Sequence, residues 1–187
     1  MDKEYLDTFE SGLLNELMKV ARSLGMLGDT LLASDDIDDK WREFAPEYMA
    51  DAVKNVNSYP EFAVACAGYA GMAIAKWWDE DWGRHHSAKF ASLLGDRGFD
   101  NMDDHIVTSI LGYSLSSTEA GVLIKTMEVL SQTTWTYIRH SSIEAGTADA
   151  FHALSRACRC LYRVGAAMQL KKMGYRFQAV NLNRLPS

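Results

Sequence analysis

Residues 60–75, PEFAVACAGYAGMAIA, contain the longest apolar run of the chain, which extends over 14 residues from Phe62 to Ala75. Small side chains recur every four residues in this run, at Ala63, Ala67, Gly71 and Ala75. On a helix this spacing places them in one stripe, against which a second backbone can approach closely. The other sides carry larger apolar residues, so we expect this helix, apolar nearly all round, at the centre of the fold.

The rest of the chain also follows the helical period. No segment shows a sustained alternation of apolar and polar residues, which is the pattern of a strand. Short connections that contain glycine are typical of antiparallel helices. The sequence therefore predicts an all-α fold, a single-domain antiparallel helical bundle of about six to eight helices over residues 1–187, without significant sheet. We expect Pro46 to separate two short helices and residues 175–187 to form an extended C-terminal arm.

Composition excludes several classes of protein. Of the 187 residues, 48% are apolar and 24% charged, which is ordinary for a soluble globular protein and unlike a collagenous or disordered one. The formal net charge of −6 argues against a nucleic-acid partner, because like charges repel. A membrane span needs about 20 strongly apolar residues, more than the central run provides, so we also expect no membrane partner.

The cysteines and the N-terminus indicate a cytoplasmic protein. Three cysteines, Cys66, Cys158 and Cys160, are an odd number, and the last two point to different faces of a helix. Free thiols fit a reducing compartment. The opening residues MDKEYLDTFE lack the basic region and apolar run of a secretory signal.

Charge is unevenly distributed along the chain. Residues 1–60 contain 13 acidic and six basic residues, whereas residues 111–187 contain four acidic and nine basic ones. A cationic face is predicted on the last long helix, formed by His152, Arg156, Arg159 and Arg163. This face fits an acidic partner or a phosphate ligand. The interpretation that we favour is a solvated face or an intramolecular match to the acidic first third.

Residues 77–86, WWDEDWGRHH, concentrate three tryptophans, three acids and two histidines. Loops on rigid scaffolds often carry function, and carboxylates beside imidazoles can bind a cation or a polar ligand. The candidate ligand-binding residues here are Trp78, Asp79, Asp81, Trp82, His85 and His86. The alternative, which we favour, is that the aromatic rings close one end of the bundle while the acids remain solvated.

A second acidic group, Asp100, Asp103 and Asp104, precedes His105, which is added to the candidate ligand residues. A helix start explains these acids more simply and is the interpretation that we favour, with Asp100 as the N-cap and the others in the first turn. The chain also contains nine methionines, scattered over several helical stretches. Methionine can line an adaptable groove, but core filling is the simpler interpretation.

Two functional hypotheses remain open. The first is a non-catalytic protein-binding or regulatory module that holds a protein partner or a second copy of itself. The alternative is a small-ligand or metal-dependent enzyme with its site at the Trp77–His86 corner, joined by His105. No nucleophile elbow, phosphate-binding loop or known spacing of metal ligands occurs in the sequence, so no catalytic residue, metal or cofactor is assigned.

Overall fold

The computed structural model describes residues 3–176, which fold into seven α-helices, a 3₁₀ turn and a π-helical turn. The α-helices are α1 (Lys3–Ser23), α2 (Asp35–Asn55), α3 (Pro60–His85), α4 (Ala91–Leu94), α5 (Met102–His105), α6 (Thr118–Arg139) and α7 (Ala148–Lys172). The 3₁₀ turn is Gly98–Asn101 and the π-helical turn is Ile106–Ile110. No strand occurs in residues 3–176, which confirms the all-α prediction. Most of the predicted arm, residues 177–187, lies outside the described residues.

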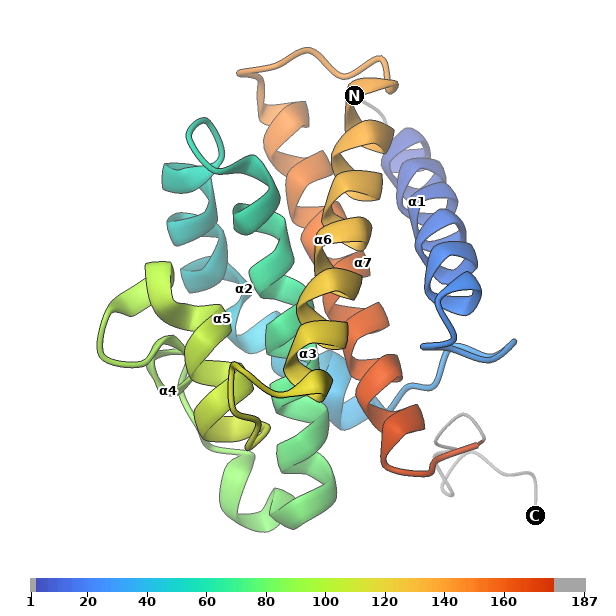
Figure 1. Cartoon of the computed structure of the whole chain (residues 1–187). Coiled ribbons are helices and arrows are strands. Elements are labelled where there is room, and N and C mark those ends of the chain that lie inside the picture. Colours follow the sequence, from blue (N-terminus) through green and yellow to red (C-terminus); the bar gives the residue numbers. More distant parts are fainter. Residues whose placement is uncertain (1–2, 177–187) are drawn as a thin grey trace, which may run out of the picture.

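The five long helices run alternately down and up along the chain, so that each is antiparallel to the next (Figure 1). The two with the most extensive mutual contact, α3 and α7, nevertheless run parallel. Along the chain, α6 is the one long helix between α3 and α7. Because each long helix is antiparallel to the next, α7 runs in the same direction as α3. Sequence periodicity predicts antiparallel neighbours along the chain, and it does not indicate this parallel central pair.

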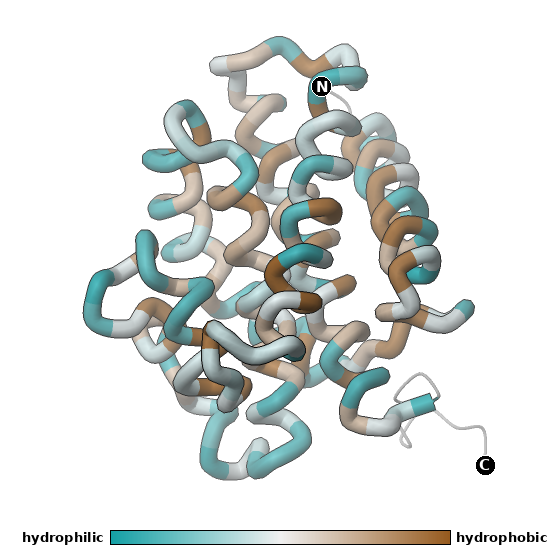
Figure 2. The backbone as a smooth tube through the Cα atoms, in the orientation of Figure 1, coloured by the Kyte–Doolittle hydropathy of each residue, from teal (hydrophilic) through white to brown (hydrophobic). Residues whose placement is uncertain are grey.

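The α3–α7 contact depends on two glycines, Gly71 and Gly165. A Cβ atom on Gly71 would collide with the carbonyl oxygen of Tyr162, and one on Gly165 would collide with the carbonyl oxygen of Gly68. The two backbones therefore touch directly, with no side chain between them. All residues from Ala63 to Ala75 are buried, and the middle of α3 is accordingly far less hydrophilic than its lower end (Figure 2). The small-residue stripe thus serves the close approach that the sequence predicts.

Two predicted helix boundaries are wrong. Pro46 lies inside α2, which continues unbroken from Asp35 to Asn55. Its missing N–H leaves one carbonyl without a helical partner, but Phe44 and Tyr48 on either side are buried, and their burial outweighs that loss. The glycine at position 83 predicts a turn after Trp82, but α3 runs to His85, with a kink at Asp81, whose backbone is extended rather than helical.

The sequence predicts N-caps at Thr147, at Ser116 in an S-x-x-E capping box, and at Asp100, and one of these three predictions is confirmed. Thr147 accepts a hydrogen bond from the Ala150 N–H at 3.1 Å, as predicted for α7. Helix α6 begins at a serine, but the cap is Ser117, one residue beyond the predicted Ser116. Asp100 caps no helix, because a 3₁₀ turn occupies Gly98–Asn101 and α5 starts only after it. Within residues 3–176 no helix is both long and apolar enough to cross a membrane.

Substituting Gly165 with alanine tests the close contact. We expect Gly165→Ala to lower the free energy of unfolding by about 1–3 kcal/mol, because overpacking against the Gly68 backbone exceeds the gain in helix propensity. Gly121→Ala is the matched control, since its added methyl on α6 meets open space. That variant should gain about 0.5–1 kcal/mol. Chemical denaturation measures both changes, and equal stabilisation by the two would contradict the contact.

Candidate functional site

The first side chains of the Trp77–His86 corner anchor the chain that follows α7. The Trp78 indole Nε1 donates a hydrogen bond to Asp36 Oδ2 at 3.1 Å, which links α3 to the first turn of α2. Asp79 Oδ1 accepts a hydrogen bond of 2.8 Å from the Tyr175 hydroxyl. The Tyr175 and Trp78 rings lie 5.6 Å apart between centroids. The start of the predicted arm is therefore held against α3.

The polar groups at the kink of α3 serve the end of that helix. Asp81 Oδ1 accepts the backbone N–H of Arg84 at 3.1 Å. His86 Nδ1 lies 3.0 Å from the carbonyl oxygen of Trp82 and 2.9 Å from that of Gly83. These local contacts satisfy backbone groups that the kink and the helix end leave without intrahelical partners.

The other two histidines lie on different elements. The His85 ring stacks on Trp77 with an interplanar angle of 7°. His105, on α5, has its Nε2 3.0 Å from the carbonyl oxygen of Ser92, on α4. The recorded contacts do not bring the seven candidate side chains together at one centre. In residues 3–176 no group of three histidine, cysteine or acidic side chains is arranged to hold a metal ion.

Two arginines of the predicted cationic face, Arg156 and Arg159, pair with acidic side chains of α1. Arg156 Nη1 donates to Asp7 Oδ1 at 2.9 Å and also to the Glu10 carboxylate. Arg159 Nη1 lies 3.5 Å from the other oxygen of Glu10. The Glu10 side chain is only 11% exposed, so this carboxylate is matched by two guanidinium groups. The contacts favour the intramolecular interpretation for both arginines.

Arg163, the third arginine of the predicted face, interacts electrostatically with Asp38 of α2. Burial raises the pKa of the Asp38 carboxyl, and the charges of Arg163 and Arg159 oppose that rise. The Nε of Arg163 is buried without a hydrogen-bond partner in the described part of the chain. His152, in contrast, is exposed, and its ring packs edge-on to that of Phe151.

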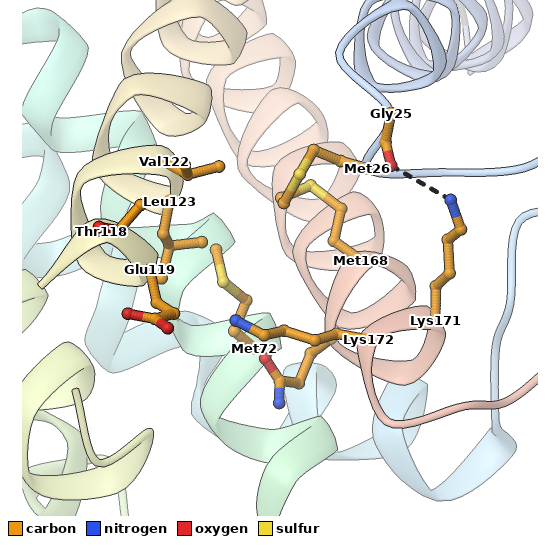
Figure 3. Close-up of a pocket in the computed structure, with 11 residues that line it drawn as sticks. Gly25, Met26, Met72, Thr118, Glu119, Val122, Leu123, Met168, Lys171 and Lys172 are labelled. Atoms are coloured by element: carbon orange, nitrogen blue, oxygen red, sulfur yellow. Dashed lines mark hydrogen bonds between the residues drawn. The ribbon is translucent and has the colours of Figure 1, made fainter.

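A cavity of about 380 Å³ lies between α3, α6, α7 and the segment after α1 (Figure 3). Figure 3 shows methionine side chains from three separate elements, Met26, Met72 and Met168, directed into the same space. We call it the methionine cavity. Its lining residues are Gly25, Met26, Met72, Thr118, Glu119, Val122, Leu123, Met168, Gln169, Lys171 and Lys172.

The floor of the methionine cavity is apolar and buried. Met72, Leu123 and Met168 are 1%, 6% and 3% exposed, and they come from α3, α6 and α7 respectively. Val122 on α6 and Met26 are more exposed and stand at the edge. Flexible, polarisable thioethers adapt to apolar groups of varied shape, so this floor is suited to an apolar ligand body.

The end of α1 directs Met26 into the cavity. Gly25 has a left-handed backbone with φ of +75°, and its N–H donates to the Arg22 carbonyl at 2.9 Å. The Met26 N–H reaches back to the Ala21 carbonyl at 2.9 Å. This pair of hydrogen bonds is the Schellman motif, which folds the residue after the glycine back onto the helix.

The mouth of the cavity carries charge. Lys171 Nζ donates to the Gly25 carbonyl at 3.2 Å (Figure 3), and Lys172 Nζ lies 4.2 Å from the centre of the Tyr113 ring. Thr118 and Glu119 form the first turn of α6, where the helix dipole is positive. Two ammonium groups and a helix N-terminus outweigh one carboxylate, so the mouth favours an anion.

Gln169 is the polar residue that lies deepest in the lining. It is 6% exposed, and its side-chain amide can both donate and accept hydrogen bonds. A polar group of a ligand inside the cavity can therefore form a hydrogen bond with Gln169.

This site was not identified from the sequence, because the position of each methionine is explained by local features without a ligand. Met72 and Met168 lie on predicted apolar faces, and Met26 follows the glycine that ends the first helix. The signal that could have found it is the Schellman glycine followed by a large apolar residue. Which methionines meet depends on the register between helices, and a single sequence does not encode that visibly.

Comparison with known proteins gives no relative. No known protein family matches the chain, no curated protein matches its sequence, and no solved structure matches its fold.

The ion pairs of Glu10 are tested by removing one guanidinium. We expect Arg156→Met, which retains the apolar stem, to lower the free energy of unfolding by about 1–2 kcal/mol, because Glu10 keeps only Arg159 as its partner. Arg42→Met is the control: its pair with Asp39 has side chains 72% and 65% exposed, and the expected loss is below about 0.5 kcal/mol. Denaturant titration compares the two, and losses of equal size would refute the distinction.

Proposed function

We propose that the protein is a non-catalytic binding protein that holds a small amphipathic anion in the methionine cavity. The observation that carries this proposal is an apolar floor of buried side chains in a cavity that opens on two lysines and is also lined by the amide of Gln169. A volume of about 380 Å³ falls within the usual range for small-molecule sites, which are mostly apolar with a few convergent polar groups.

The lining suggests how such a ligand lies. Its apolar body follows the floor formed by Met72, Leu123 and Met168. Its anionic head lies at the mouth, within reach of the Lys172 ammonium group. A polar atom next to the head forms a hydrogen bond with the Gln169 amide. To contact the anionic head, Lys172 gives up only its contact with the Tyr113 ring. This loss is small, because a cation–π contact at an exposed site is worth about 0.5–1 kcal/mol.

The titratable groups of the lining favour binding over catalysis. They are Glu119, Lys171 and Lys172, and all three are exposed at the mouth rather than set against the apolar floor. An acid–base catalyst needs a titratable group held at hydrogen-bonding distance from the reacting atoms. The proposal thus keeps the non-catalytic function expected from the sequence, and it moves the ligand site away from the Trp77–His86 corner.

Charge preference is the first test. Isothermal titration calorimetry with dodecanoate should give micromolar affinity, whereas dodecyltrimethylammonium, with the same chain and a cationic head, should bind at least about tenfold more weakly. Lys172→Gln should weaken dodecanoate binding about fivefold to tenfold, because it removes the ammonium group at the mouth. Lys125→Gln is the control. Lys125 is an exposed lysine on α6 that does not line the cavity, so this variant should bind as the native protein does. Equal affinity for the two probes would overturn the anion preference.

Blocking the mouth is the second test. Val122 is 51% exposed, so Val122→Trp adds bulk over the cavity without disturbing the core, and dodecanoate binding should be lost. Val53→Trp on α2, where the native side chain is 42% exposed, is the matched control and should bind normally. His86→Ala should bind normally too. Loss of binding in His86→Ala with retention in Val122→Trp would return the ligand site to the Trp77–His86 corner.

A further inference from the structure

A second, larger hollow lies on another face of the molecule, between α2 and α7. Its volume is about 860 Å³, and we call it the α2–α7 groove. Trp41 and Met49 are buried and form its floor, being 5% and 4% exposed. The apolar walls include Pro46 and Val53 from α2 and Phe151 from the start of α7. None of these residues lines the methionine cavity, so the two hollows are separate.

The walls expose apolar surface in a helical pattern. Pro46, Ala50 and Val53 are exposed and are spaced i, i+4 and i+7 along α2, so they form one stripe on the outer side of that helix. Val53 is 42% exposed, and Phe151 on the opposite wall is 44% exposed. A stripe with this spacing normally faces another helix, and in residues 3–176 no element covers it.

All the charged side chains that line the groove are basic. Arg42, Lys54, Arg156 and Arg159 line it, and no acidic side chain does. The pair of Arg42 with Asp39 is exposed to solvent and therefore weak, so a carboxylate from a partner can replace it at little cost. Lys54 has no ion pair among the described residues.

Arg156 and Arg159 can accept a further carboxylate without releasing Glu10. Their recorded ion pairs use Nη1 of each guanidinium. A guanidinium has five N–H donors, so donors remain on both side chains. The basic lining of the groove thus stays attractive to an acidic group even though part of its charge is matched inside the fold.

Pro46 adds a polar feature to the apolar wall. Because proline has no N–H, the carbonyl of Arg42, one turn earlier, lacks its helical donor. Residues four apart share one face of a helix, so this carbonyl lies on the groove side with Pro46. A hydroxyl or amide of a bound chain can satisfy it.

We infer that the α2–α7 groove binds an acidic amphipathic helix of a partner protein. Helices α2 and α7 run antiparallel here, since Ile37 contacts Tyr162 while Val53 and Phe151 line the same groove. The trough between two such helices accepts a third, whose apolar residues at i, i+3, i+4 and i+7 meet the floor. Its glutamates or aspartates then pair with the basic lining. This inference does not depend on the ligand proposed for the methionine cavity.

The experiment uses a designed probe and the full chain. The probe is a fluorescein-labelled peptide of about 18 residues, long enough for about five helical turns, with leucine at the i, i+3, i+4 and i+7 positions and glutamate elsewhere. A second peptide carries lysine in place of every glutamate. Fluorescence anisotropy should show binding of the acidic peptide with micromolar affinity, and at least about tenfold weaker binding of the basic one.

Two pairs of variants locate the contact. Val53→Glu and Lys54→Glu should each weaken binding of the acidic peptide about tenfold or more, because they place negative charge in the groove. Leu115→Glu, at a site 46% exposed before α6, and Lys125→Glu on α6 are the matched controls and should bind as the native protein does. All four variants change exposed residues, and circular dichroism verifies that each is folded.

Three results would overturn the inference. The acidic peptide does not bind; or it binds Val53→Glu and Lys54→Glu as tightly as the native chain; or the basic peptide binds equally well. Sedimentation of the native protein adds a fourth. A dimer that dissociates on Val53→Glu would show that a second copy of this chain, rather than an acidic partner, occupies the groove.

Discussion

Direct backbone contact between α3 and α7 is the constraint on which the rest of the fold depends. Glycines at 71 and 165 let the two helix backbones come into direct contact, because a Cβ at either position would collide with the other helix. The remaining long helices then cover the outer sides of this pair. Helix α6 fits against Gly68 through the Met127 side chain, and α2 fits through the aromatic ring of Trp41, which lies 5.1 Å from that of Tyr162. The methionine cavity and the α2–α7 groove lie where α7 and a covering helix, α6 or α2, are not in close contact.

Much of the fold could be predicted from sequence because burial has a period. The apolar run at 60–75 identifies the central helix, and its glycine and alanine stripe indicates the close crossing. Boundaries were harder to predict where two effects oppose each other. At Pro46 the loss of one hydrogen bond competes with burial of Phe44 and Tyr48, and burial prevails. At Gly83 the intrinsic preference for a turn loses to continued helical pairing beyond the kink at Asp81.

The candidate functional residues follow the same pattern: local features were visible in the sequence, whereas contacts between distant helices were not. Sequence composition identified the dense aromatic and acidic stretch at 77–86, but local hydrogen bonds occupy many of its polar groups. The basic residues of α7 were predicted to form one face that is either solvated or matched by the acidic first third, and Arg156 pairs with Asp7 and Glu10 of that third. The methionine cavity could not be foreseen, because it is assembled from residues 26, 72 and 168, which only the packing of distant helices brings together.

The parallel central pair also has a consequence for how the chain is made. Helix α3 can form soon after its last residue, His85, leaves the ribosome, whereas its partner α7 begins only at Ala148 and is synthesised later. At about 5–20 residues per second, the buried face of α3 waits on the order of ten seconds for the backbone it is shaped to meet. During that interval the long helices of the described residues that can pack on α3 are α2 and, later, α6. The nascent protein is therefore expected to depend on chaperones and to tolerate poorly any truncation that removes α7.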